Sequence, residues 1–417
     1  MNGVSPPSIN KVREDLLTIF QAGLAAVNGR HCVTGFLQTW PPARPVSVVA
    51  LGKAASAMAA GAVDTLGERL QRALLVTKPG HVETSLQQDA RFTCMEAGHP
   101  VPDERSLRAG AALLRFLEDT PDDEDILFLI SGGTSSLVEV LPEGVTLEGL
   151  QRVNQWLLAS GLSIADINRI RQSISAIKGG RLARWSAHLQ VTVAMISDVA
   201  GDDPAIVGSG LLSPQADHPL NRAQLPVWLQ ALLEKVSPRW PAATDFTRVS
   251  LHIIARLDDA LQAAAANARA LGYPANIMEP KLYGDALATG GEIIEILRQQ
   301  PAGIYIWGGE TSVKLPDRPG RGGRNQSLAL SAAMALVPQD TIVVLAAGTD
   351  GTDGPTPAAG AMVDSQTVSR GTACGLVARE SLQHADAGTF LEASGDLITT
   401  GPTGTNVTDM VIGLKTG

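Results

Sequence analysis

Short apolar runs alternate with longer helix-like segments along almost the whole chain, and this alternation limits the possible folds more than any other feature. Apolar runs bounded by glycine and polar residues are typical of strands buried on both faces. Strands that alternate with helices favour a parallel sheet covered by helices on both sides. We therefore predict an α/β protein with strands at 46–51, 73–77, 93–96, 126–130, 191–196, 249–255, 275–279, 303–307, 341–346 and 409–414. Helices are expected at 8–29, 54–66, 106–118, 146–160, 163–175, 257–271, 284–299 and 326–337, with helical segments near 365–394.

The chain has 417 residues, which is more than one ordinary hydrophobic core accommodates, so two domains are expected. The composition changes around residues 237–248, where Ser237-Pro238-Arg239-Trp240-Pro241 is polar and punctuated by proline. We therefore predict an N-terminal domain over residues 1–240 and a C-terminal domain over residues 249–417.

The formal net charge of −9 argues against a nucleic-acid or anionic-membrane surface, because such a surface needs a net basic face. Positive charge is concentrated in glycine-rich turns, which favours a small anionic ligand. Cys32, Cys94 and Cys374 are odd in number and far apart, which suggests a reducing cytosol rather than disulfides or a zinc site. No apolar run approaches the ~20 residues needed to cross a bilayer. We expect a soluble cytoplasmic protein, monomeric or homodimeric, that binds neither nucleic acid nor membranes.

Several predicted strands end in small or charged residues. Ligands of open parallel sheets bind at the carboxyl ends of the strands, so these ends are the first places to look for a site. The strand ends in question are Gly52-Lys53, Ser131-Gly132-Gly133-Thr134-Ser135-Ser136, Ser197-Asp198, Gly308-Gly309-Glu310-Thr311 and Gly348-Thr349-Asp350-Gly351. Their number favours a ligand site over chance.

Each of these turns also has an ordinary structural interpretation. Lys53 could be a solvated lysine at a helix start, or its ammonium could lie over a phosphate. Residues 131–136 could be a plain strand-to-helix turn or an anion-binding nest of N–H groups. They lack the second glycine of a G-x-S-x-G elbow, which disfavours a serine hydrolase. Asp198 could cap a helix, or it could hold Mg²⁺ or accept a hydroxyl proton.

Two further segments place cations beside glycines. Lys178-Gly179-Gly180-Arg181 could end a helix with a basic last turn, or bind an anion. In Arg321-Gly322-Gly323-Arg324-Asn325-Gln326, two arginines lie where a strand gives way to a helix, so that the backbone and the helix start could face a phosphate or carboxylate.

Three other places remain ambiguous. The loop at 348–356, with Asp350 and Asp353, lacks calcium-ligand spacing and fits a metal–phosphate complex better. The glycine- and threonine-rich turn at 401–407 could be a plain surface loop. His99 could fix its turn or contact a substrate.

Common nucleotide and metal signatures are missing from the chain. No G-x-G-x-x-G follows the first strand, no G-x-x-x-x-G-K-[ST] occurs, and no H-E-x-x-H or cysteine/histidine cluster suggests zinc. The anion site is therefore neither the usual dinucleotide site nor a P-loop.

Taken together, these motifs resemble those of the glycerate 2-kinase family, whose C-terminal part is the MOFRL domain. The resemblance covers nearly the whole chain. It rests on 51–55, 96–100, 130–136, 177–181, 197–199, 308–311, 322–326, 348–354 and 400–407. One departure is Asp386-Ala387-Gly388, where relatives tend to show Asp-Ser-Tyr, so a hydroxyl contact from this segment is not expected.

The resemblance implies phosphorylation of D-glycerate at its 2-hydroxyl, with ATP and Mg²⁺, in a cleft between a large Rossmann-like domain and a smaller α/β C-terminal domain. Lys53, Asp198 and Arg324 would be catalytic, and Asp198 and Asp350 would bind the metal. The nucleotide-binding positions would be Gly132, Gly133, Thr134, Ser135, Ser136, Lys178, Gly308, Gly309, Glu310, Thr311, Asn325, Asp350 and Asp353.

The physical chemistry of phosphoryl transfer agrees with this assignment, because such enzymes supply alignment and cations rather than covalent chemistry. We expect Lys53 and Arg324 to face the γ-phosphate from opposite domains, with Asp198 on the glycerate hydroxyl or the metal. Arg321 or Arg324 could bind the glycerate carboxylate. Two rivals stay open: an NAD(P)H-dependent hydroxypyruvate reductase, a name often given to members of this family, and a non-enzymatic anion-binding protein.

Overall fold

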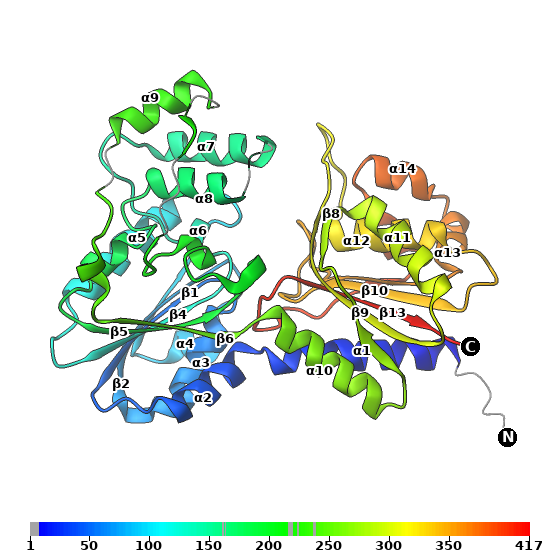
Figure 1. Ribbon diagram of the computed structural model, residues 1–417, viewed down its shortest axis with the longest axis horizontal. Coiled ribbons are helices and arrows are strands. Elements are labelled where there is room, and N and C mark those ends of the chain that lie inside the picture. The colour runs from blue at the N-terminus through cyan, green and yellow to red at the C-terminus, as the bar shows by residue number, and fades with distance from the viewer. Residues whose placement is uncertain (1–7, 161, 163, 216–219, 223–224, 237–238) are drawn as a thin grey trace. The chain divides into compact units, whose positions relative to one another are not determined.

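The computed structural model describes residues 8–160, 162, 164–215, 220–222, 225–236 and 239–417, and the chain divides into two compact units (Figure 1). The N-terminal unit consists of residues 28–255 and 404–406. The C-terminal unit consists of the chain up to Val27, residues 256–403 and residues 407–417. Among the described residues, no helix is long and apolar enough to cross a membrane.

The N-terminal unit contains a six-stranded sheet in which every pairing is parallel, in the order β3-β2-β1-β4-β5-β6. Its strands are β1 (Val46–Leu51), β2 (Leu70–Thr77), β3 (Phe92–Glu96), β4 (Asp125–Ile130), β5 (Gln190–Ile196) and β6 (Val249–Ala255). Leu51 pairs with Ile130, and Ile130 pairs with Met195. The turns after β1, β4 and β5 therefore leave the sheet at one edge. The predicted α/β class with a parallel sheet is confirmed.

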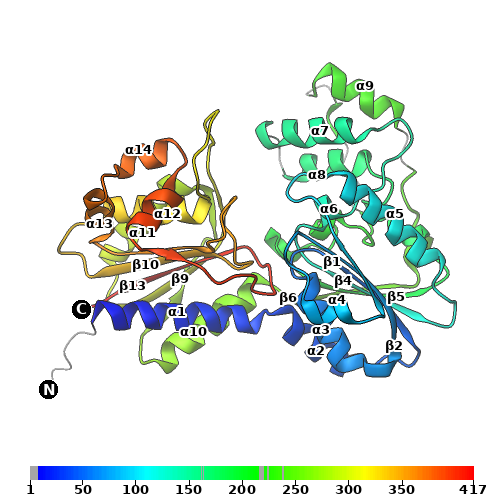
Figure 2. The ribbon, with the colours of Figure 1, turned by 180° about the vertical axis from the view of Figure 1, so that it is seen from behind.

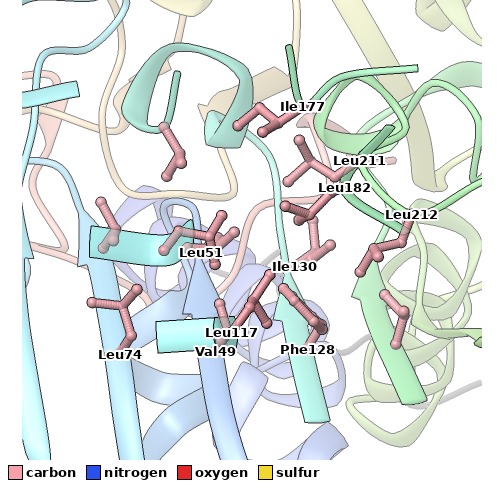
Figure 3. Packing of buried hydrophobic residues seen from close by; sticks show 14 of the residues in the cluster. Val49, Leu51, Leu74, Leu117, Phe128, Ile130, Ile177, Leu182, Leu211 and Leu212 are labelled. Carbon is pink, nitrogen blue, oxygen red and sulfur yellow. The ribbon is translucent and has the colours of Figure 1, made fainter. Parts of the chain in front are cut away.

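Helices cover both faces of this sheet, as Figures 1 and 2 show for α3 (Ala55–Leu66) and α5 (Glu104–Glu118). The central strand β1 is buried along its whole length, as expected for a strand between two helical layers. Leu117 of α5 packs with Val49 and Phe128 in one apolar cluster (Figure 3). The unit's other helices are α2 (Gly29–Thr39), α4 (Thr84–Gln88), α6 (Thr134–Leu137), α7 (Leu147–Ala159), α8 (Ile164–Ser173) and α9 (Val227–Lys235).

The C-terminal unit contains a mixed sheet in the order β12-β11-β10-β13-β9-β7, with β8 beside β9. Its strands are β7 (Ala275–Ile277), β8 (Leu282–Asp285), β9 (Gly303–Ser312), β10 (Ile342–Gly348), β11 (Gly360–Val363), β12 (Leu397–Ile398) and β13 (Asp409–Lys415). β9 and β10 are both antiparallel to β13, so they run in the same direction. Their carboxyl ends therefore share one edge with Asp409, the first residue of β13.

Helices also cover both faces of the mixed sheet. Figures 1 and 2 show α1 (Ile9–Ala26) and α10 (Leu257–Ala270) on one face, and α11 (Ala286–Gln299) and α12 (Arg324–Ala335) on the other. The short helices α13 (Thr367–Ala373), α14 (Ala378–Gln383) and α15 (Ala387–Ala393) complete the unit.

Two boundaries differ from those expected from the sequence. The chain divides after Ala255 rather than within 241–248, because β6 pairs with β5 in the sheet of the N-terminal unit. The first helix ends earlier than expected, because Asn28 starts α2 and its side chain accepts a hydrogen bond from the N–H of Arg30 at 3.0 Å. α1 then belongs to the C-terminal unit, where it packs against α10.

Candidate active site

The turns that follow β1 and β4 are joined by hydrogen bonds. The N–H of Lys53 donates to the carbonyl of Gly132 at 2.9 Å, and the N–H of Ala54 donates to Ser131 Oγ at 3.0 Å. Gly52 has a φ of 116°, and a β-carbon there would overlap Ser131. Glycine is therefore required at 52 for the two turns to meet, and their meeting fixes where the Lys53 side chain starts.

The second glycine of the β4 turn lies close to two side chains, which follow the strands β1 and β3. Gly133 has a φ of 87°, a left-handed conformation that favours glycine. A β-carbon at this position would lie 3.1 Å from both Lys53 Cγ and His99 Nε2. Lys53 and His99 therefore approach the same point of the turn. The sequence left the role of His99 open, and the structure places its ring with the predicted catalytic lysine.

The first glycine of the turn makes room for a different pair. A β-carbon at Gly132 would overlap Asp198 Oδ2 and Asn406 Nδ2, and these two atoms are hydrogen-bonded at 3.0 Å. Asn406 belongs to the short 404–406 segment of the N-terminal unit and is 5% exposed. Sequence reasoning noted the turn at 401–407 without assigning this residue a role.

The N-terminal unit thus gathers the side chains of Lys53, His99 and Asp198 around one glycine turn at the carboxyl edge of its sheet. Lys53, His99 and Asp198 are each partly exposed, so a ligand can reach them. A cation beside bare backbone suits a phosphate or carboxylate, and a carboxylate suits a hydroxyl or a metal ion. Two of the three predicted catalytic residues are brought together here.

The hydroxyl groups of the 131–136 turn mostly hold the turn itself. Thr134 Oγ1 donates to the carbonyl of Ser131 at 2.7 Å, and Ser136 Oγ donates to the carbonyl of Gly133 at 3.0 Å. Ser135 Oγ accepts a hydrogen bond from Ser209 Oγ at 2.8 Å. Thr134 is fully buried. A ligand role for this turn therefore rests on its glycine backbone more than on its hydroxyls.

Lys178 is not brought to this group of residues. Its Nζ lies 2.5 Å from Glu139 Oε2, and the two side chains are 3% and 0% exposed. The same carboxylate accepts a hydrogen bond from Ser175 Oγ at 2.5 Å. Arg181 Nη1 donates to three backbone carbonyls between 172 and 178, and burial lowers the pKa of its guanidinium to about 10. The predicted nucleotide contact of Lys178 is replaced by a buried ion pair with a residue that the sequence did not single out.

In the C-terminal unit, Arg324 opens α12 and is held by two carboxylates. Its Nε and Nη2 donate to the two oxygens of Asp409 at 2.6 and 3.0 Å, and Nη1 lies 2.5 Å from Glu310 Oε1. Burial opposes the charged form, but Asp409 and Glu310 raise the pKa of the Arg324 guanidinium above its usual value. The guanidinium is therefore charged at any working pH. Asp409 is a partner that sequence reasoning missed.

Asp353 and Asn325 fix the start of the same helix. The carboxylate of Asp353 accepts hydrogen bonds from the N–H groups of Asn325 at 3.1 Å and Gln326 at 2.8 Å, which caps α12. Asp353 is 2% exposed, and burial raises the pKa of its carboxyl to about 7. Both residues were predicted to bind nucleotide, but the structure uses them to set the helix end that carries Arg324.

The predicted turn at Gly308-Gly309-Glu310-Thr311 is wrong, because β9 continues through Ser312. Gly309 has a φ of 144°, and a β-carbon there would overlap the carbonyl of Leu282 on β8. Gly309 therefore lets β8 approach β9, whereas a β-carbon at Gly308 would overlap the side chain of Leu257 on α10. Thr311 is buried, and Glu310 contributes through Arg324 instead.

Asp350 lies in the turn after β10, close to the partner of Arg324. Its Oδ1 accepts hydrogen bonds from the N–H and hydroxyl of Thr352 at 2.9 and 3.1 Å. A β-carbon at Gly348 would lie 3.4 Å from Asp350 Oδ1 and 3.5 Å from Asp409 Oδ1. Within the part of the chain that the structure describes, no three histidine, cysteine or carboxylate side chains are grouped so as to hold a metal ion by themselves.

Comparisons with known proteins match both halves of the chain. A family model described as a domain of unknown function (DUF4147) matches residues 15–228, and the model of the MOFRL family matches residues 303–409. The crystal structure of a glycerate kinase from Thermotoga maritima has a TM-score of 0.82 and 34% sequence identity, and the match covers 98% of this chain and 100% of that one.

Relatives that match over most of their length include a kinase and a provisionally named reductase. A D-glycerate 2-kinase from Thermotoga maritima is 38% identical over 383 residues, which cover 88% of this chain and 90% of that protein. A protein from Agrobacterium vitis, provisionally named a hydroxypyruvate reductase, is 37% identical over 87% of this chain and 97% of its own length. The resemblance expected from the motifs is therefore confirmed, and the chain belongs to the glycerate kinase family, with the MOFRL domain in its C-terminal unit.

Proposed function

We propose that this chain transfers the γ-phosphoryl group of ATP to the 2-hydroxyl of D-glycerate and releases 2-phosphoglycerate and ADP. One observation carries the proposal: in a chain of the glycerate kinase family, Lys53 and Asp198 approach one glycine turn, Gly132-Gly133, at the carboxyl edge of the parallel sheet. A cation and a carboxylate beside one turn are the groups that phosphoryl transfer to a hydroxyl requires.

The residues of the N-terminal unit would act on the reacting atoms. A bond forms between the glycerate 2-oxygen and the γ-phosphorus, and the bond from that phosphorus to the β–γ bridging oxygen breaks. Asp198 orients the hydroxyl and accepts its proton. Lys53 balances the negative charge on the equatorial oxygens. The missing side chains of Gly132 and Gly133 let Asp198 and Lys53 lie close to the turn where the phosphate would bind.

The C-terminal unit would contribute Arg324 as an anion-binding group. Asp409 holds its Nε and Nη2 in a bidentate contact, while Nη1 faces Glu310. The Glu310 side chain is 47% exposed and can turn toward solvent. An incoming phosphate or carboxylate can take its place on Nη1 while Asp409 keeps the guanidinium in position. Arg324 would then stabilise the charge that develops during transfer.

Magnesium is part of the proposal as a companion of the nucleotide. Mg²⁺ usually keeps several waters and is held by one or two carboxylates together with substrate phosphates. Asp198 and Asp350 are the candidates, because each supplies a single carboxylate just after a strand. Either of them, together with substrate phosphates, would hold the ion, which when bound would neutralise part of the phosphate charge.

The deciding experiment uses purified protein with D-glycerate, ATP and Mg²⁺, coupled to enolase without a phosphoglycerate mutase. Enolase accepts 2-phosphoglycerate, so the coupled signal reports both the transfer and its position. ADP release without the enolase signal would place the phosphate on another hydroxyl.

The same preparation tests the reductase name carried by one relative. Oxidation of NADH or NADPH with hydroxypyruvate, in the absence of glycerate-dependent ADP release, would refute the kinase proposal. The chain lacks a G-x-G-x-x-G after its first strand, and β1 is followed instead by Gly52-Lys53-Ala54. We therefore expect no such oxidation.

A further inference from the structure

Asn406 is the least expected member of the group around Gly132. It is 5% exposed, and its Nδ2 donates to Asp198 Oδ2 at 3.0 Å across 208 positions of sequence. A carboxylate accepts and does not donate hydrogen bonds, so the amide nitrogen rather than the amide oxygen must face Asp198. The bond therefore has a defined polarity.

The backbone just before Asn406 is held within the N-terminal unit. The carbonyl of Gly404 accepts a hydrogen bond from the N–H of Gly29 at 2.8 Å, at the start of α2. Thr405 is 1% exposed. A buried amide on a backbone held in this way keeps one position, so it can fix the group that it contacts.

Gly132 shows that the position of this pair is specific. A β-carbon at 132 would overlap both Asp198 Oδ2 and Asn406 Nδ2, so the sequence omits a side chain where the two meet. A carboxylate rotates about its terminal bond with broad preferences unless a partner restrains it. One hydrogen bond from a fixed amide restrains that rotation and sets which direction the remaining lone pairs face.

We propose that Asn406 is a positioning residue for Asp198: its amide holds the carboxylate in the orientation that meets the hydroxyl of the substrate. This inference rests on the proposed function. Asn406 does not touch the reacting atoms in this proposal and acts through Asp198. Sequence order hides the relationship, because the 404–406 segment joins the N-terminal unit although it lies between β12 and β13 of the C-terminal unit.

The test compares Asn406→Ala with wild-type protein in the enolase-coupled assay. Loss of an orienting partner typically costs about 10–100-fold in activity, so we expect kcat to fall by that factor. The KM for ATP should change less than about threefold, because nucleotide contacts are kept. Asn168→Ala, which removes another buried asparagine of the same unit, serves as the control and should stay within about twofold.

A double-mutant cycle with Asp198→Asn tests whether Asn406 acts through Asp198. If it does, Asp198→Asn/Asn406→Ala should be no slower than Asp198→Asn alone. A further loss by the same factor as in the wild-type background would overturn the proposal, because Asn406 would then act independently. If the kcat of Asn406→Ala stayed within about twofold of the wild-type value, the proposal would be overturned as well.

A donor–acceptor exchange covers the case in which Asn406→Ala does not fold. In Asp198→Asn/Asn406→Asp the amide and the carboxylate change places, so the hydrogen bond and the volume are retained. We expect near wild-type thermal unfolding and a kcat as low as that of Asp198→Asn. Recovery of kcat in the exchanged variant would show that the bond is structural only. Wild-type protein without glycerate turnover would refute the proposed function itself, which distinguishes that failure from failure of this inference.

Discussion

The buried ion pair between Lys178 and Glu139 can be tested directly. Lys178 was predicted to bind nucleotide, and in the structure it pairs with a buried carboxylate. Lys178→Met removes the ammonium, which lies 2.5 Å from Glu139 Oε2 in the wild type. The Glu139 side chain is 0% exposed, so its carboxylate stays buried without a cation. Removing one partner of a buried pair costs about 3–5 kcal/mol, because the remaining charge is uncompensated. For a unit of this size each kcal/mol lowers Tm by roughly 2–4 °C. The expected fall in Tm is therefore roughly 6–20 °C.

The assay is thermal unfolding followed by circular dichroism, with kinase kinetics measured well below the transition. The double variant Lys178→Met/Glu139→Gln removes the stranded charge and should recover most of the lost Tm. Lys235→Met, at an exposed lysine at the end of α9, is the matched control and should leave Tm nearly unchanged. At the lower temperature the KM for ATP should stay close to that of the wild type.

The opposite pattern would refute this reasoning. If Lys178→Met kept the wild-type Tm and raised the KM for ATP by about tenfold or more, the lysine would bind nucleotide as its motif suggests. The corresponding energy would be about 1.4 kcal/mol in ground-state binding, since each tenfold change corresponds to that amount. The fold would then have to release Lys178 from Glu139 when the nucleotide binds.

Further predictions concern the site residues themselves. Lys53→Ala, Asp198→Asn and Arg324→Ala should each lower kcat by roughly 10²–10⁴-fold with an unchanged unfolding transition, and near-normal turnover in any of them would remove that residue from the mechanism. Glu310→Gln frees Nη1 of Arg324 from a partly exposed ion pair worth about 0.2–1 kcal/mol. The KM of the anion that Arg324 binds should therefore fall by roughly 1.4–5-fold. An increase in this KM would show that Glu310 and the anion do not compete for Nη1. The pKa of Asp353 is raised in the folded protein to about 7, so its contribution to stability is full below about pH 4 and is lost as the pH rises through about 7. The side chain of Asp353→Asn cannot ionise. Between about pH 4 and pH 7 the Tm of the wild type should therefore fall relative to the Tm of this variant. A Tm difference that does not change with pH would argue against an effect of burial on the Asp353 carboxyl.

The sequence predicted the regular elements well where a pattern is local. The strands 46–51 and 249–255 have the predicted bounds, because short apolar runs flanked by polar residues leave little freedom. The break between α1 and α2 was missed, because helical periodicity continues through Asn28 and only its side chain shows that it caps the next helix. The two-residue strand β12 has no signal of its own and exists through pairing with β11.

For the candidate site, the sequence indicated residues at strand ends but not the residues that pair with them. Lys53 and Asp198 were singled out because they lie two residues beyond the ends of β1 and β5, a position that a single sequence reveals, and their catalytic roles stay predictions. Their partners were missed because pairing is a property of the fold. Asn406 lies 208 positions from Asp198, Asp409 lies 85 positions from Arg324, and Glu139 lies 39 positions from Lys178. A charged residue in a glycine-rich turn can bind a ligand or a buried partner, and only the partner's position decides between these roles.

The balance of charge in the C-terminal unit bears on how an anionic nucleotide could be accepted there. Arg324 carries one positive charge and is bonded to Asp409 and Glu310, and Asp350 Oδ1 lies beside Asp409 across Gly348. This group is net negative, so bare ATP would meet repulsion on approach. Two changes relieve it: Glu310 turns away from Nη1, or the phosphates arrive with a divalent cation that a carboxylate can share. Either change would let Arg324 bind phosphate although it lies among carboxylates. In the proposed function the carboxylates would hold the guanidinium in place, and the nucleotide would bring its own cation.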